Sequence, residues 1–171
     1  MAGMDARENG PEVRIEPWSE DGLALLRKIN TPEMKRHLGG PETDAQVSAR
    51  HQRYLDVSRG RMFQVVLARS GEAVGSIGFW ERVWHGETVY ETGWSVLPPH
   101  QGRGIAVAAA TALVSAVRAE AGHRYLHAFP SVGNPASNAI CRRVGFTLLG
   151  PCEIEFPPGC VMHSNDWRLE L

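Results

Sequence analysis

The stretch VYETGWSVLPPHQGRGIA, residues 89–106, decides the fold. Its first half is rich in β-branched and aromatic residues, which is typical of a strand. Pro98 and Pro99 end that strand, and apolar residues then recur every four positions from Ile105 to Glu120, which predicts a helix. The two elements are joined by Gln101-Gly102-Arg103-Gly104, a turn that leads from a strand directly into a helix.

Outward from this segment, the patterns predict strands and helices over the rest of the chain. Strands are expected at residues 13–16, 63–68, 74–84, 89–96, 125–129, 147–155 and 161–169, and residues 61–97 form an antiparallel meander. Helices are expected from 19 or 21 to 30, from 31 to 39, from 43 or 44 to 59, from 105 to 120 and from 134 to 144. The fold class is therefore α+β, with a mixed, largely antiparallel central sheet of about seven strands and helices on both faces.

Length and composition bound the kind of protein. The 171 residues suit one domain, expected at 11–171 after a flexible N-terminal tail at 1–10. A net charge of −1 gives no reason to expect a nucleic-acid partner, and the most apolar stretch, 105–117, is too short to span a membrane. Three cysteines without a CxxC pair and seven scattered histidines predict no metal site. We expect a cytoplasmic protein, monomeric or homodimeric.

The turn at 101–104 has the properties of an anion site. Gly102 and Gly104 allow a tight turn and close approach of a ligand, and the amides at a helix start have no intrahelical partner. A P-loop would need Lys-Ser/Thr where this chain has Ile105-Ala106, and a dinucleotide fingerprint would need Gly or Ala at Val107. Both of these phosphate-binding motifs are therefore excluded.

The spacing Q-x-x-G-x-A at 101–106 resembles the coenzyme A pyrophosphate loop of the GCN5-related N-acetyltransferase (GNAT) superfamily. A second match, to the family's N-x-x-S/A…G-F segment, lies at Asn134, Ser137 and Gly145-Phe146. The stretch from Glu91 to Ala106 is similar to the RimJ/RimL-like branch. The resemblance implies direct acetyl transfer from acetyl-CoA to a primary amine, which is a protein N-terminus, a lysine, a polyamine or an antibiotic amine.

The same resemblance implies the residues that bind the donor. The strand that ends at Val96 and Leu97 is expected to bulge and splay from its neighbour, so that its free amides bind the pantetheine arm. The pyrophosphate would lie against the backbone of Gln101, Gly102, Arg103, Gly104, Ile105 and Ala106, with the Arg103 side chain optional. Asn134 followed by Pro135 is an ordinary helix start, and the resemblance adds contact between Asn134 and the pantetheine arm.

Two residues are candidates for proton transfer. Glu91 is expected to act as general base, because an amine is mostly protonated at neutral pH and must lose a proton before it attacks the thioester. Ser137 is the expected proton donor near the coenzyme sulfur. Many family members use a Tyr four residues later, but this chain has Cys141 there, which we expect in the core.

The acceptor site matches no motif in the sequence. We expect it to be built by the first two helices and the last strands, with Trp80, Trp84 and Trp94 either lining it or packed in the core. Glu153, Glu155 and Asp166 would either attract a cationic acceptor or form a solvated face. Two other classes of protein stay open: a non-catalytic acyl-CoA-binding or regulatory module, and an interaction protein that uses its aromatic strands.

Overall fold

A seven-stranded sheet organises the computed structural model, which describes residues 10–171. The predicted tail at 1–10 lies outside this range apart from Gly10. The strand order is β1-β2-β3-β4-β5-β7-β6, and β4–β5 is the parallel pair among antiparallel ones. The α+β class and the mixed, largely antiparallel sheet are thus confirmed. The strands are β1 (Val13–Pro17), β2 (Gly60–Leu67), β3 (Ala73–Trp84), β4 (Glu87–Val96), β5 (Tyr125–Ala128), β6 (Thr147–Glu155) and β7 (Val161–Glu170).

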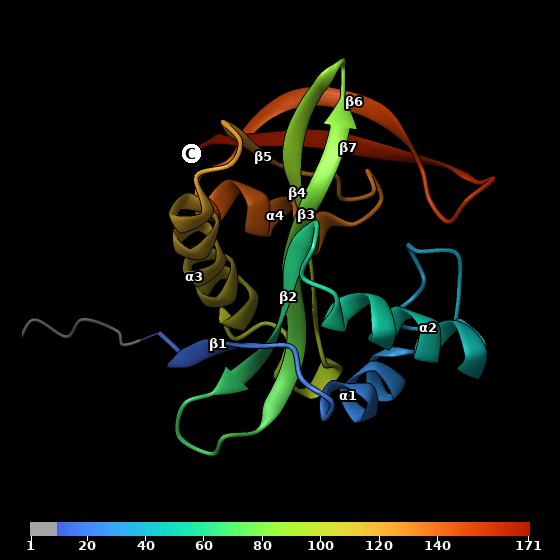
Figure 1. Ribbon diagram of the computed structural model, residues 1–171, viewed down its shortest axis with the longest axis vertical. Coiled ribbons are helices and arrows are strands. Elements are labelled where there is room, and N and C mark those ends of the chain that lie inside the picture. Colours follow the sequence, from blue (N-terminus) through green and yellow to red (C-terminus); the bar gives the residue numbers. More distant parts are fainter. Residues whose placement is uncertain (1–9) are drawn as a thin grey trace, which may run out of the picture.

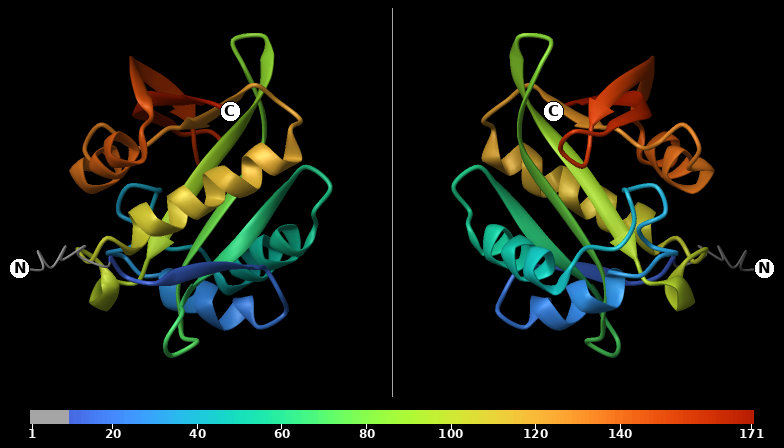
Figure 2. Two further views of the ribbon diagram at one scale, coloured as in Figure 1. Left: turned by 90° about the vertical axis from the view of Figure 1, so that its left-hand side faces the viewer. Right: turned by 90° about the vertical axis from the view of Figure 1, so that its right-hand side faces the viewer.

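Helices cover both faces of the sheet, as predicted (Figure 1). Long α3 lies across β3 and β4 and packs against α4 (Figure 2). Leu113 of α3 and Leu126 in the sheet are fully buried in the core that they share. A second apolar cluster around Trp18 and Leu26 fills the space beneath the other two helices. No helix within residues 10–171 is long and apolar enough to cross a bilayer. The helices are α1 (Gly22–Ile29), α2 (Asp44–Leu55), α3 (Ile105–Glu120) and α4 (Pro135–Val144), with a short 3₁₀ turn, η1 (Pro98–His100).

Helix α2 begins as predicted and ends sooner. Thr43 and Gln46 form a reciprocal capping box, which satisfies two amides at the helix start. The predicted end at Arg59 is wrong, because Asp56 adopts an extended conformation and its carboxylate accepts the Ser58 N–H at 2.9 Å. This local bond competes with the helix, and Gly60 already belongs to β2.

The predicted helix at 31–39 is wrong: residues 31–39 form successive turns without an α-helix. The ends of the segment are tied together, since the Asn30 side chain bonds both the N–H and the C=O of Glu42 at 2.8 Å. Gly39 and Gly40 both have φ of +87°, which is incompatible with a continuing helix. The segment is therefore a closed loop, here called the 30–42 loop.

Strands β4 and β5 separate part-way along their length. Their parallel pairing spans Tyr90 to Thr92 on β4, whereas β4 stays paired with β3 as far as Val96. Beyond Thr92 the side of β4 that faces β5 therefore has no strand partner. This parting is at the end of the sheet where α3 and α4 begin.

Candidate active site

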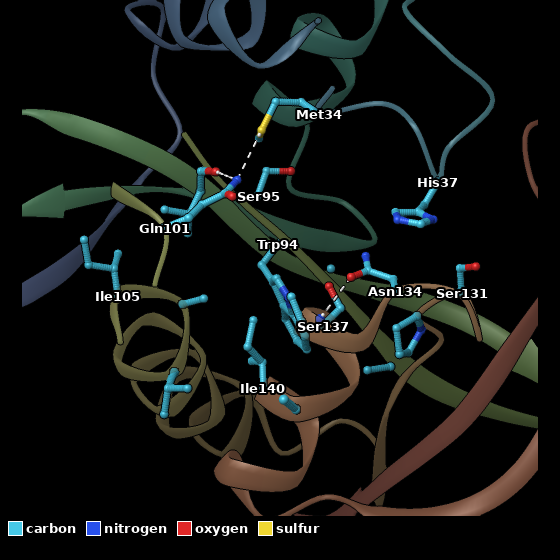
Figure 3. Close-up of a pocket in the computed structure, with 18 of the residues that line it drawn as sticks. Met34, His37, Trp94, Ser95, Gln101, Ile105, Ser131, Asn134, Ser137 and Ile140 are labelled. Atoms are coloured by element: carbon cyan, nitrogen blue, oxygen red, sulfur yellow. Dashed lines mark hydrogen bonds between the residues drawn. The ribbon is translucent and has the colours of Figure 1, made fainter. Parts of the chain in front are cut away.

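A cavity of about 650 Å³ lies where β4 and β5 part. Figure 3 shows its walls: Trp94 and Gln101 on the β4 side, Asn134 and Ser137 from the start of α4, and His37 from the 30–42 loop. The cavity thus brings together both segments that the sequence singled out.

The turn into α3 has the geometry of an anion cradle. Gly102 and Gly104 have φ of +73° and +78°, in the left-handed region that favours glycine. The first hydrogen bond of α3 runs from Ala108 N–H to Gly104 C=O at 3.1 Å, so the amides before it are available to a ligand. Together with the helix dipole, these amides fit a pyrophosphate such as that of coenzyme A. Arg103 is exposed, and its side chain does not line the cavity.

The strand amides differ in part from the prediction. Leu97 N–H is not free, because it donates to Val74 C=O at 2.8 Å, and Leu97 does not line the cavity. Hydrogen-bonded and non-hydrogen-bonded pairs alternate in an antiparallel ladder, so the amides of Trp94 and Val96 point away from β3, into the gap. The expected bulge is also absent, since β4 keeps one register against β3 from Glu87 to Val96. Val96 therefore stays a candidate amide donor, and Trp94 replaces Leu97.

Gln101 has a role that its position in the motif did not reveal. Its side-chain amide donates to the Val96 C=O at 2.8 Å and lies 3.6 Å from the Met34 sulfur. It thereby satisfies a carbonyl that faces the gap and links the 30–42 loop to the cradle. Gln101 shapes the cavity wall as well as lining it.

The start of α4 is held rigidly at the cavity. Asn134 caps the helix, as predicted, by accepting the Ser137 N–H at 3.2 Å. One residue further on, Asn138 donates to two carbonyls of this turn, and its oxygen accepts from Asn165 and Trp167 of β7 at 2.9 Å. The Ser137 hydroxyl, which lines the cavity, has no hydrogen-bond partner in the described part of the chain.

Cys141 is part of the core, as expected. It is fully buried, does not line either cavity, and burial raises the pKa of its thiol to about 12. The position that carries a tyrosine in many GNAT proteins is therefore unable to reach a ligand in the cavity.

A second cavity, of about 630 Å³, lies on the other side of β4. It shares Leu38, Met162 and the β4 residues Thr92 to Ser95 with the first cavity. The 30–42 loop, the end of α2, strands β2 to β4 and the last two strands contribute to its walls, and α1 does not. The two cavities meet over the stretch of β4 whose amides face the gap.

Glu91 lines the second cavity, and its side chain is 14% exposed. Its Oε2 accepts from Trp80 Nε1 at 2.8 Å and from Arg82 at 3.0 Å. Within residues 10–171, Oε1 has no hydrogen-bond partner. The structure does not place Glu91 and Ser137 in one cavity: they lie on opposite sides of the shared β4 stretch.

The model of the acetyltransferase (GNAT) domain family matches residues 12–147 of this sequence. The chain belongs to the GNAT acetyltransferase family. It is therefore an acyltransferase by family, and the predicted resemblance is confirmed. A comparison with curated protein sequences finds no match.

Solved structures share the GNAT fold at low sequence identity. The aminoglycoside acetyltransferase AAC(6')-Ib with coenzyme A is 19% identical, with a TM-score of 0.75 over 93% of this chain and 95% of that one. RimL, the ribosomal L7/L12 alpha-N-protein acetyltransferase, with coenzyme A is 18% identical, with a TM-score of 0.76 over 93% and 94%. An acetyltransferase from Agrobacterium tumefaciens str. C58 is 22% identical, with a TM-score of 0.74 over 93% and 91%.

The acidic residues proposed to attract a cationic acceptor do not line either cavity of this GNAT protein. Glu155 accepts the Gly159 N–H at 2.8 Å, and exposed Glu153 lies 3.7 Å from His163. Asp166 is buried and bonds His127 at 2.6 Å and Trp84 at 3.0 Å. Glu153 and Glu155 fit the alternative of a solvated face. Asp166 fits neither alternative, because its carboxylate is buried in a hydrogen-bonded network.

The buried network of Asp166 predicts an acid-sensitive step in stability. Burial alone would raise the pKa of Asp166, but hydrogen bonds from His127 and Trp84 hold it below its usual value. Its contribution is therefore present above the unfolded-state pKa of about 3.9 and is lost as the pH falls through the lower folded-state value. We expect Asp166→Asn to lower the free energy of unfolding by about 2 kcal/mol at pH 7.

Urea unfolding at pH 7 and pH 3.5 measures this effect. The deficit of Asp166→Asn should shrink at the lower pH, where the wild type has lost part of the same contribution. Glu153→Gln is the matched control, because it removes an exposed carboxylate near a histidine and should change little. An equal deficit at both pH values would contradict the pKa direction.

Three residues that line the first cavity were not singled out in the sequence. Met34 and His37 come from the 30–42 loop, and Arg143 follows Ser137 by almost two turns of α4. Loop residues of this kind have no periodicity to reveal them. Arg143 was identifiable in principle, since it lies seven residues after Ala136 and so on the same face of α4, and a cation suits a phosphate.

Proposed function

We propose that this GNAT protein transfers an acetyl group from acetyl-CoA directly to a primary amine. The observation that carries the proposal is the meeting of two cavities over Thr92–Ser95 of β4. One cavity has the phosphate cradle and the other has a carboxylate next to the shared stretch. Such an arrangement lets two substrates approach one point from opposite sides. The proposed compartment is the cytoplasm.

On the donor side, the chain would hold acetyl-CoA by its backbone. The amides around Gly102 and Gly104 would bind the pyrophosphate, and those of Trp94 and Val96 would bind the pantetheine arm or the thioester carbonyl. When bound, acetyl-CoA supplies an activated acetyl thioester. The Ser137 hydroxyl is the proposed proton donor to the departing thiolate, because it lines this cavity and has no protein partner in the described residues.

On the acceptor side, Glu91 is the proposed general base. Arg82 and Trp80 hold its Oε2, which fixes the orientation of the carboxylate and leaves Oε1 for an amine or a bridging water. The Trp80 ring also lies against β4, where a Cβ at Gly93 would come within 3.2 Å of it. Trp80 is therefore proposed to position both the base and the strand.

A thiol-release assay tests the proposal. Purified protein with acetyl-CoA should release free thiol when a primary amine is added, across a panel of N-terminal peptides, lysine, polyamines and aminoglycosides. Calorimetry with coenzyme A alone reports donor binding separately. Binding of coenzyme A without thiol release from any amine would favour the non-catalytic acyl-CoA-binding module. If the protein neither bound coenzyme A nor released thiol, the proposal that the first cavity holds acetyl-CoA would be wrong.

A further inference from the structure

The charge of the second cavity is the feature that the proposed function leaves unexplained. An amine acceptor is a cation in water, and a site for it would be expected to be acidic. The lining is instead mainly cationic. The charged side chains on the cavity side of the sheet are Lys35, Arg50, Arg53, Arg59 and Arg82, against the carboxylates Asp56 and Glu91.

Part of this positive charge is neutralised inside the protein. Arg82 pairs with Glu91, and Arg50 makes a two-pronged bond to Glu42, with both contacts at 2.8 Å. Glu42 also forms an ion pair with Lys35, whose ammonium lies 3.6 Å from its carboxylate. A single carboxylate thus faces two cations at this wall, and Arg61, also at the lining, turns to Glu120 of α3 instead.

Lys35 is the cation that is hardest to explain by structure alone. It belongs to the 30–42 loop, and its side chain is 9% exposed. Burial, and then the charge of Arg50, hold the pKa of Lys35 below its usual value. A buried lysine that shares its one carboxylate with an arginine lowers the stability of the fold, unless a further anion approaches it.

Arg53 and Arg59 extend the positive surface to the mouth of the cavity. Both are exposed, and neither takes part in an ion pair among residues 10–171. Asp56 is their nearest acidic neighbour in sequence, and its carboxylate accepts from Ser58 N–H. Counting Glu42, five cations face three carboxylates, and the carboxylate of Glu91 lies at the inner end beside the shared stretch of β4.

We propose that the acceptor is an amine that also carries an anionic group, a carboxylate or a phosphate. Its amine would lie at Glu91, and its anionic group would lie among Lys35, Arg53 and Arg59. Guanidinium and ammonium groups bind carboxylate and phosphate oxygens with charge-assisted hydrogen bonds. This inference rests on the proposed function and narrows it: polycations, such as the kanamycin bound in an AAC(6')-Ib structure, are excluded as acceptors of this protein.

Matched acceptors test the proposal with the full chain and acetyl-CoA. The tripeptide amides Ser-Glu-Glu, Ser-Gln-Gln and Ser-Arg-Arg each carry a single primary amine and differ in charge, and phosphoethanolamine against ethanolamine supplies the phosphate arm. We expect kcat/KM for an anionic member to exceed that of its neutral partner by about tenfold to a hundredfold, the range of one charge-assisted contact. The preference should weaken with added salt.

The double variant Arg53→Gln/Arg59→Gln should lose most of the preference for anionic acceptors. The KM for the anionic acceptor should rise, and the affinity for coenzyme A should stay unchanged. Arg69→Gln is the control, since Arg69 is exposed in the β2–β3 turn and lines neither cavity. A preference for the neutral or the arginine-containing peptide, or equal effects of the double variant and of Arg69→Gln, would overturn the inference.

Calorimetry separates this failure from failure of the proposed function. The same peptides are titrated into protein saturated with coenzyme A, where no turnover is needed. Tighter binding of the acidic peptide supports the charge preference even if thiol release is absent, whereas equal binding of all three peptides contradicts it whatever the activity.

Discussion

Gly102→Val should weaken acetyl-CoA binding by about a hundredfold, which corresponds to about 2.7 kcal/mol. Gly102 has φ of +73°, and a β-branched residue avoids that region, so the turn would change its backbone conformation. The amides of the cradle would then no longer converge on the pyrophosphate, and several charge-assisted bonds would be lost together. Isothermal titration with acetyl-CoA measures the effect.

The β2–β3 turn offers a matched control. Gly71 has φ of +72°, and, like Gly102, it has no atom within 4 Å of an added Cβ. Gly71→Val therefore introduces the same backbone strain, of about 1–2 kcal/mol, away from either cavity. We expect both variants to lose similar thermal stability and only Gly102→Val to lose affinity. Equal affinities in the two variants would mean that the turn does not bind the donor.

Glu91→Gln should lower kcat/KM by about a hundredfold or more, the usual range for loss of a general base. The amide keeps the shape of the side chain and can still accept from Trp80 Nε1, but it cannot take a proton from the amine. Donor binding should be unchanged, because Glu91 lies outside the first cavity. Steady-state thiol release and calorimetry on the same preparation separate the two quantities.

Glu81→Gln is the control for charge and position. Glu81 lies on β3, is exposed, and pairs with His123 at 2.9 Å on the other side of the sheet. Its loss should leave turnover intact. If Glu91→Gln retained wild-type kcat/KM, the base would have to be another group or water, and the carboxylate would be reduced to a partner for Arg82.

The sequence was sufficient where local physics decides the outcome. Helix α3 runs from Ile105 to Glu120 as predicted, because apolar residues recur at every fourth position directly after a glycine turn. Asn134, Pro135 and Gly145 mark the ends of α4 in the same way, through a cap, a fixed φ and a left-handed residue. These signals involve neighbours in the chain and need no tertiary partner.

Only the tertiary structure decided which groups face a ligand. Leu97 N–H proved to be bonded to Val74 because the β3–β4 register, not the motif, sets the direction of each amide. The pattern of residues 31–39 predicted a helix, but hydrogen bonds between Asn30 and Glu42 close this segment into a loop. The loop places Lys35 in the lining of the second cavity. Amide direction, loop closure and the sign of a cavity's charge arise from contacts between residues that are distant in the sequence. The glycine turn and the helix that follows it depend on consecutive residues, so the sequence alone predicts them.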